Sequence, residues 1–354
     1  MSVSSPSQTD PRFVRHLMEM EGAFSRLDED SDTRFYSKER MVEHLDRTAL
    51  ETVETLIGSL VIEDEPVILD LMASWDSHLP DSMSPSRMVG LGLNPRELDA
   101  NPLLTQRVIQ DLNTNPHLPF DDEAFDLVLN VVSVEYLTDP VAVFEEVGRV
   151  LKPGGLVLVV FSNRWFPPKV VRVWEDASEH ERIGLVQEFL READAFGEQG
   201  RFISMGLPRP EDDRYYEEGI PSDPVFAVFA EKKGGAEDRP LRPVPEDPAD
   251  MQVDPREVDS RKRTVPETHL CPHCSEPLAR WEVPDDPCID WNNDYMYLCF
   301  NDACPFVVRG WRFMWEQGIE GHSYRYLFNP ATDGSTTVPI RGLNDLRPGI
   351  VAGT

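Results

Sequence analysis

The chain has no cysteine in its first 270 residues and few basic side chains for its length. Of its 354 residues, 34 are lysine or arginine and 64 are aspartate or glutamate, which gives a formal net charge of −30. A surface this acidic repels phosphate backbones and anionic membranes, so no direct nucleic-acid partner is expected. The sequence also lacks a membrane-length apolar run and a basic, apolar leader, so we expect a cytoplasmic protein without a membrane partner.

The most clearly patterned stretch runs from residue 118 to residue 163. Residues 125–132 form a short apolar run of the kind found in buried parallel strands. Asp139-Pro140 then begins a helix, and the sequence Lys152-Pro153-Gly154-Gly155 separates that helix from a second apolar run, 156–161. This order predicts one right-handed crossover unit of a parallel sheet. The apolar face of the helix contains Val141, Phe144, Val147, Val150 and Leu151.

The LPFDDEAFD stretch at 118–126 and the LKPGG turn at 151–155 resemble the class I S-adenosylmethionine-dependent methyltransferases, in particular their type 11 branch. Residues 67–71, 88–91 and 108–112 resemble the first three strands of that family. The resemblance implies an α/β fold: a doubly wound, mostly parallel Rossmann-like methyltransferase sheet. It also implies that S-adenosyl-L-methionine is the cofactor, bound by Asp70, Ala73, Ser74, Asn94, Asp111, Leu112 and Asn130.

The first loop departs from the family pattern, which is roughly D-x-G-x-G-x-G. Met72, Ser74 and Asp76 stand at the glycine positions, so their side chains are expected to crowd the cofactor. The acid that usually ends the second strand is also missing: Gly92 stands there, and Asn94 or Glu97 is the nearest substitute. Asp76 would repel the cofactor carboxylate, whereas the nearby His78 either replaces lost contacts or caps a turn.

The methyl acceptor is expected beyond the fourth and fifth strands, because open parallel sheets bind ligands past the carboxyl ends of their strands. Glu135 or Tyr136 is the candidate base, and Arg164 is the candidate ligand for an anionic acceptor. The alternative for each residue is a structural role in a loop or at a helix start.

The cysteines form two short clasps separated by 24 residues. Cys271, Cys274, Cys299 and Cys304 have the spacing of a zinc ribbon, in which four thiolates close a tetrahedral structural site. The competing interpretation is four reduced core cysteines. Cys288 and His273 are nearby ligand-type residues that we interpret as bystanders.

Aromatic residues surround the cysteines, and Trp311, Phe313 and Trp315 alternate with a period of two. That period predicts one face of a strand, forming the core of a small β-rich unit. The alternatives are a protein-contact face and a stacking platform for bases.

The sequence therefore divides into five segments. Residues 1–33 are a disordered start with a capping helix, 34–233 the methyltransferase-like domain, 234–268 a flexible proline- and charge-rich linker, 269–328 the zinc-ribbon-like domain, and 329–354 an irregular tail. Residues 33–60 are expected to form one or two helices with Val42 facing inward. Because few contacts cross such a linker, the two domains are expected to unfold separately.

Two functions fit these features. The first is an S-adenosylmethionine-dependent methyltransferase of unknown acceptor, with an appended zinc ribbon that recognises a protein partner. The second is a catalytically inactive adaptor in which the methyltransferase-like sheet has lost its cofactor. Cofactor affinity separates the two.

Overall fold

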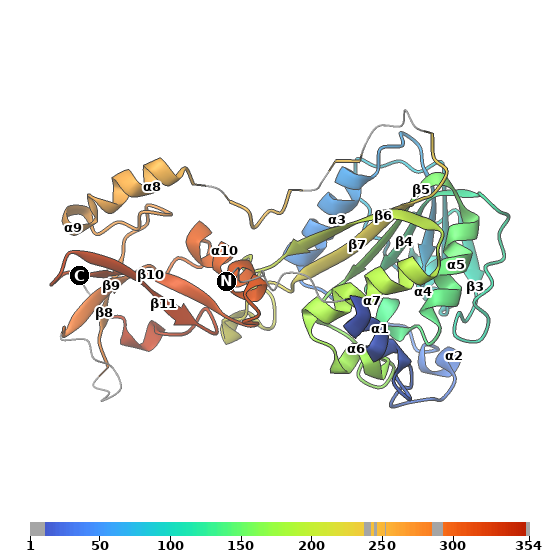
Figure 1. The fold of residues 1–354 in the computed structure, drawn as a ribbon, viewed down its shortest axis with the longest axis horizontal. Coiled ribbons are helices and arrows are strands. Elements are labelled where there is room, and N and C mark those ends of the chain that lie inside the picture. Colours follow the sequence, from blue (N-terminus) through green and yellow to red (C-terminus); the bar gives the residue numbers. More distant parts are fainter. Residues whose placement is uncertain (1–10, 237–241, 244–245, 252, 285–292, 352–354) are drawn as a thin grey trace.

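The computed structural model describes residues 11–236, 242–243, 246–251, 253–284 and 293–351. The elements form two units, a larger one built on the first seven strands and a smaller one built on the last four (Figure 1). Cys288 lies outside the described residues. Within the described ranges, no helix is long and apolar enough to cross a membrane.

The larger unit contains a seven-stranded sheet with the order β3-β2-β1-β4-β5-β7-β6. The first five strands run parallel, and β7 is antiparallel to both of its neighbours. This sheet confirms the predicted doubly wound, mostly parallel fold. Because β1 pairs with β2 on one side and β4 on the other, the strand order reverses at β1. In open α/β sheets, ligands bind beside such a reversal, past the carboxyl ends of the strands. The strands are β1 (Val67–Leu71), β2 (Arg87–Gly92), β3 (Gln106–Ile109), β4 (Phe125–Val131), β5 (Leu151–Phe161), β6 (Phe196–Ser204) and β7 (Val225–Lys232).

Helices cover both faces of this sheet, as Figure 1 shows. Successive residues of β4 alternate between the two cores: Val128 joins one, and Leu127 and Leu129 join the other. The first core includes side chains of α1 (Pro11–Glu19), α5 (Pro140–Val150), α6 (Arg172–Asp176) and α7 (Glu179–Glu192). The second includes side chains of α3 (Arg47–Leu60) and α4 (Pro95–Ala100).

The junction of α5 and β5 differs from the expectation in two respects. Asp139 caps α5 by accepting a hydrogen bond from the Ala142 amide at 3.2 Å, and the helix ends at Val150, one residue before Leu151, which the sequence had placed on its apolar face. The KPGG segment does not separate helix from strand, however, because β5 begins directly at Leu151. The pairing with β4 shifts register within this segment, so these residues form an irregularity inside the strand.

Residues 33–60 contain the helices expected there, but the segment between them is a loop. Between α1 and α3 the chain forms one short helix, α2 (Asp32–Phe35), and residues 36–46 form no helix or strand. Val42, expected to face inward, is 56% exposed. The expectation for Val42 was wrong because this stretch covers the carboxyl edge of the sheet as a loop instead of packing as an amphipathic helix.

The smaller unit contains a four-stranded antiparallel sheet with the order β11-β10-β9-β8. Residues 334–340, placed in an irregular tail by the sequence, form an edge strand because they pair with β10 along its whole length. The elements are β8 (Ala279–Glu282), β9 (Tyr295–Leu298), β10 (Ser323–Asn329), β11 (Gly334–Ile340), α8 (Pro255–Lys262), α9 (Val265–Thr268) and α10 (Pro305–Glu316). Short 3-10 helices are η1 (Val134–Tyr136), η2 (Tyr216–Glu218) and η3 (Arg347–Gly349).

The tryptophan-rich segment is a helix, not the strand that its alternation predicts. Trp311 and Trp315 lie on α10 and are buried, whereas Phe313 between them is 52% exposed. Residues four apart lie on the same face of a helix and also on the same face of a strand, so the spacing of Trp311 and Trp315 fits both structures. Pro305 at the first helical turn, directly after Cys304, favours the helix.

The two units pack directly against each other, in contrast to the expected independence. The Trp315 ring stacks on His180 of α7 with 3.5 Å between centroids, and it also contacts Phe226 of β7 at 6.0 Å. A Cβ at Gly206 would lie only 2.5 Å from Trp311, which shows how closely the backbone approaches α10. One apolar core therefore runs from the large sheet into the smaller unit.

The segment between the units contains more structure than an extended tether. Residues 255–268 include α8 and α9. The buried Asp247 forms an ion pair with Arg312 of α10, with 3.2 Å between the carboxylate oxygen and the guanidinium nitrogen. Several of its remaining residues lie outside the described ranges.

Candidate cofactor site and metal centre

A cavity of ≈ 410 Å³ opens at the carboxyl ends of the parallel strands. A volume of this size suits a small-molecule ligand or cofactor. Six of the seven predicted cofactor residues line it, namely Asp70, Ala73, Ser74, Asn94, Asp111 and Leu112, and the candidate acceptor residues Tyr136 and Arg164 line it as well. The strand order reverses beside this cavity, so its position agrees with the ligand position of open α/β sheets.

The loop after β1 has one residue in the left-handed conformation, at the first position where the family pattern places a glycine. Met72 stands at the first glycine position and has φ 63°, a left-handed conformation that normally favours glycine. The next amide, of Ala73, donates to the Leu91 carbonyl at 2.8 Å. A Cβ at Gly92 would lie 2.3 Å from the Ala73 carbonyl oxygen, so the glycine at this position of β2 makes room for the loop.

Two of the side chains expected to crowd the cofactor bind neighbouring protein groups. The Ser74 hydroxyl donates to a Glu97 carboxylate oxygen at 2.8 Å. Asp76 forms an ion pair with His78, with 3.0 Å between its carboxylate and Nδ1. The interaction with His78 holds the pKa of Asp76 at about 2. Burial alone would lower the pKa of His78, but Asp76 outweighs it and raises that pKa. When protonated, His78 offsets the repulsion expected between Asp76 and a cofactor carboxylate.

Asp70 lies below this loop and is 5% exposed. Burial raises its pKa to about 7, and the hydrogen bond that it accepts from the Ser77 hydroxyl at 2.6 Å partly opposes that rise. Asp70 therefore takes up a proton near neutral pH, and the charge on the cavity floor changes with it.

The substitutes for the missing acid of β2 already have protein partners. The Asn94 carbonyl oxygen caps α4 by accepting from the Arg96 amide at 3.0 Å, and its amide donates to the Tyr36 carbonyl at 2.9 Å. The Glu97 carboxylate accepts from Ser74 and from the Arg40 amide, each at 2.8 Å. Each carboxylate oxygen has a second lone pair, so Glu97 keeps the capacity to accept a ligand hydroxyl.

Asp111, which follows β3, is half-buried and faces the cavity. Its two oxygens accept from the Asn113 amide at 3.0 Å and the Thr114 hydroxyl at 3.1 Å, and this turn fixes the carboxylate direction. The adjacent Leu112 is buried and supplies an apolar wall.

Two predicted site residues do not line the cavity. Asn130 is fully buried, and its amide donates to the Leu71 carbonyl at 3.3 Å, so it supports the loop from behind. Glu135 is 1% exposed, and burial raises its pKa to about 8. A carboxyl group that is protonated at neutral pH and absent from the cavity wall is a poor general base, so the structure argues against that role for Glu135.

The acceptor side is aromatic. The Tyr136 hydroxyl accepts a hydrogen bond from the Phe166 amide at 2.9 Å, and the two rings stack with centroids 6.0 Å apart. Burial raises the pKa of Tyr136 well above its usual range, so its phenol keeps its proton. Arg164 forms an ion pair with the buried Asp223 at 2.8 Å, and it lies over the Tyr215 ring at 4.7 Å.

Sequence reasoning missed the far wall of the cavity. Tyr36, Arg40 and His44 come from the loop before α3, and Arg214 and Tyr215 come from the connection between β6 and β7. The Arg40 guanidinium lies 4.6 Å from the Phe35 ring and 5.2 Å from the Phe166 ring. No periodic pattern marks these loops, and only their aromatic and basic content distinguishes them.

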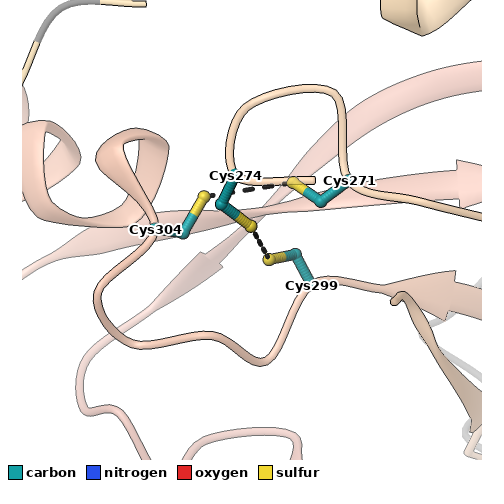
Figure 2. Close-up of side chains that lie close together, drawn as sticks. All are labelled: Cys271, Cys274, Cys299 and Cys304. Carbon is teal, nitrogen blue, oxygen red and sulfur yellow. Dashed lines mark hydrogen bonds between the residues drawn. The ribbon is translucent and has the colours of Figure 1, made fainter. Parts of the chain in front are cut away.

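The four cysteines of the smaller unit converge, as Figure 2 shows. Their sulfur atoms all lie within 4.8 Å of one another, with 3.9 Å between Cys271 and Cys304 and 3.6 Å between Cys274 and Cys299. Four thiolates bound tetrahedrally to zinc at ~2.3 Å would lie about 3.8 Å apart, so the arrangement fits that ion. Three of these cysteines are buried, which suits a closed structural site. The His273 ring instead packs on Phe306 at 4.1 Å.

Known proteins support the fold assignment for part of the larger unit. Residues 77–159 match the model of a methyltransferase domain. The malonyl-[acyl-carrier protein] O-methyltransferase of Marinomonas sp. (strain MWYL1) is 25% identical over 140 residues, which is 37% of this chain and 51% of that protein. The chain thus spans about half the length of this curated relative. The match at 77–159 contains β2 to most of β5 and begins just after the altered loop.

Solved structures with a similar arrangement have low sequence identity to this chain. A chain from a complex that contains the Haloferax volcanii Trm112 methyltransferase activator is 18% identical, with a TM-score of 0.38, covering 53% of this chain and 91% of that chain. An S-adenosylmethionine-dependent methyltransferase from Mesorhizobium loti is 17% identical, with a TM-score of 0.34. The match covers 50% of this chain and 95% of that chain. An S-adenosylmethionine-dependent methyltransferase from Aquifex aeolicus is 15% identical, with a TM-score of 0.34. The match covers 64% of this chain and 100% of that chain.

Proposed function

We propose that the chain is an S-adenosylmethionine-dependent methyltransferase whose cofactor occupies the cavity beside β1. The observation that carries the proposal is the loop after β1, in which Met72 keeps the left-handed backbone of a glycine and Gly92 keeps the space for that loop. When bound, the cofactor supplies an activated methyl group for in-line displacement. Asp70, Glu97 and Asp111 line the cavity and would hold its polar groups, and Leu112 would supply an apolar wall.

On the acceptor side, the chain mainly has to orient the acceptor and exclude water. The Tyr136 phenol keeps its proton, accepts from the Phe166 amide and hydrogen-bonds the Glu135 carboxyl, so its ring is fixed as a wall of the acceptor side. Arg164, held by Asp223, is the candidate ligand for an anionic group. Positioning of this kind can contribute several kcal/mol to a displacement reaction that needs no protein nucleophile.

We further propose that Cys271, Cys274, Cys299 and Cys304 hold one structural zinc ion. The mutual distances of their sulfur atoms and their burial support this assignment. The methyl acceptor, a protein partner of the smaller unit and the cytoplasmic location remain predictions.

Titration of the protein with S-adenosylmethionine tests the cofactor proposal, with Trp75 in the cavity wall as a fluorescent reporter. We expect saturable quenching with micromolar or weaker affinity, and Trp75→Phe should remove the signal without removing binding. Absence of binding at about 1 mM ligand, or about 4 kcal/mol, would favour the inactive adaptor.

A further inference from the structure

The connection between β6 and β7 brings two side chains to the cavity. Arg214 and Tyr215 line the acceptor side, and η2 follows them directly. Arg209 fixes the base of this connection by ion pairs to Asp223 at 2.6 Å and Asp213 at 3.1 Å. The tip of the connection, residues 214–219, extends past these anchors toward the smaller unit.

The smaller unit holds that tip through two hydrogen bonds. The Leu343 amide donates to the Gly219 carbonyl at 2.7 Å, and the Asn344 side-chain amide donates to the Glu217 carbonyl at 2.8 Å. Gly219 has φ 67°, and a Cβ there would lie 2.7 Å from the Asn344 backbone nitrogen. The contact is therefore a close approach of two backbones, which a glycine permits.

The same segment is tied to the cysteine cluster by a buried arginine. Arg325 is fully buried, and its guanidinium donates to the Cys299 carbonyl at 3.1 Å and to the Leu343 carbonyl at 2.8 Å. Asp302, between the last two cysteines, accepts from Arg325 at 2.5 Å and from Arg347 at 2.6 Å. A short chain of hydrogen bonds thus joins the cysteine clasp to the loop tip at Gly219.

The cofactor side has no such connection. The loops after β1, β2 and β3 make their hydrogen bonds and ion pairs within the larger unit, in the part of the chain that the structure describes. The two sides of the cavity therefore depend on different parts of the molecule.

We propose that the smaller unit is a scaffold for the acceptor side of the cavity, with Arg325 and Asn344 as positioning residues for the loop tip that carries Arg214 and Tyr215. This inference rests on the proposed function for the meaning of the acceptor side. Loss of the metal or of these hydrogen bonds loosens residues 214–219 and leaves the cofactor affinity unchanged.

Hydrogen exchange on the full chain, as purified with its metal, tests this inference. Asn344→Ala removes one anchor, so exchange at residues 214–219 should become about five-fold faster, as for the loss of one ordinary hydrogen bond. The matched control is Thr336→Ala, an exposed change on β11 that should leave the same peptides unaffected. Chelation of the metal, and separately Arg325→Gln, should produce a larger increase over residues 206–222.

Calorimetric binding of S-adenosylhomocysteine to the same samples completes the test. We expect its affinity to change by less than about two-fold on Asn344→Ala, as for a change that touches no ligand contact. Unchanged exchange at 214–219 after both chelation and Arg325→Gln would overturn the inference, and so would a fall in affinity parallel to the loosening. If the intact protein binds no S-adenosylhomocysteine, the proposed methyltransferase function fails, while the exchange data still decide whether the smaller unit holds the loop.

Discussion

The two units reach a folded state by different means. The larger unit buries both faces of a seven-stranded sheet under helices, and its strands β4 and β5 are almost entirely inaccessible. The smaller unit has a separate core of only five buried residues, and its α10 places two tryptophans against the larger unit. A core this small usually needs a metal or a partner surface. We therefore expect the smaller unit to depend on the proposed metal and on its contact with the larger unit.

Removal of the metal should have the largest effect. Zinc binding in comparable structural sites corresponds to about 10–16 kcal/mol, so Cys299→Ser should abolish metal retention and unfold β8–β11. Because α10 also covers part of the large sheet, the larger unit should then melt at a lower temperature than before. Elemental analysis should find about one zinc per chain in the parent protein, and calorimetry should report the melting.

Cys288→Ser is the matched control and should retain the metal. Absence of metal from protein prepared without chelators would contradict the zinc assignment. An unchanged melting temperature of the larger unit after Cys299→Ser would show that the two units are independent.

Truncation of the interface should have the next largest effect. Trp315 is 4% exposed and contacts both His180 and Phe226, so Trp315→Ala should cost about 3–5 kcal/mol in the free energy of unfolding. Phe313→Ala, on the exposed side of the same helix, should cost less than about 0.5 kcal/mol. Urea unfolding measures both. Equal costs for the two variants would mean that the units do not share a core.

The stability of the larger unit should fall as pH rises through the neutral range. Burial raises the folded-state pKa of Glu135 to about 8 and that of Asp70 to about 7. Between the ordinary pKa of a carboxyl group and these values, the folded state holds a proton that the unfolded state lacks. The free energy of unfolding therefore decreases with pH across that window, by up to about 1.4 kcal/mol per pH unit for each group.

Glu135→Gln should remove the Glu135 part of this slope, and it should make the protein more stable relative to the parent near pH 8. Denaturation series at pH 5, 6, 7 and 8 test this. A pH slope that is the same for Glu135→Gln and for the parent would contradict the raised pKa of Glu135.

The smallest effect concerns the cofactor contacts. Asp111→Ala should weaken S-adenosylhomocysteine binding by about 1.5–3 kcal/mol, the value of a hydrogen bond to a charged group. Thr114→Ala removes only a group that orients this carboxylate and should have a weaker effect. If Asp111→Ala leaves the affinity unchanged, the cofactor does not contact the end of β3.

The sequence predicted the parts of the molecule that have local patterns. The crossover from β4 through α5 to β5 follows from apolar spacing and from the Asp139-Pro140 start, and the four-cysteine cluster follows from the clasp spacing. The period of Trp311 and Trp315 was ambiguous because an interval of four residues is common to one face of a strand and one face of a helix.

The remaining features depend on contacts between distant segments. Nothing in the sequence near Asn344 indicates that it binds the Glu217 carbonyl, and nothing near Val42 shows that this loop forms a cavity wall. Asn94 has the right residue type for a ligand contact, but the same chemistry makes it a helix cap. Such roles are decided by tertiary position, which residue type alone does not encode.

Isothermal titration of the metal-loaded protein with S-adenosylhomocysteine tests the central claim most directly. The account predicts saturable binding of one molecule per chain with micromolar or weaker affinity, and competition with S-adenosylmethionine for the same site. No heat and no competition up to about 1 mM, equivalent to about 4 kcal/mol, would contradict it.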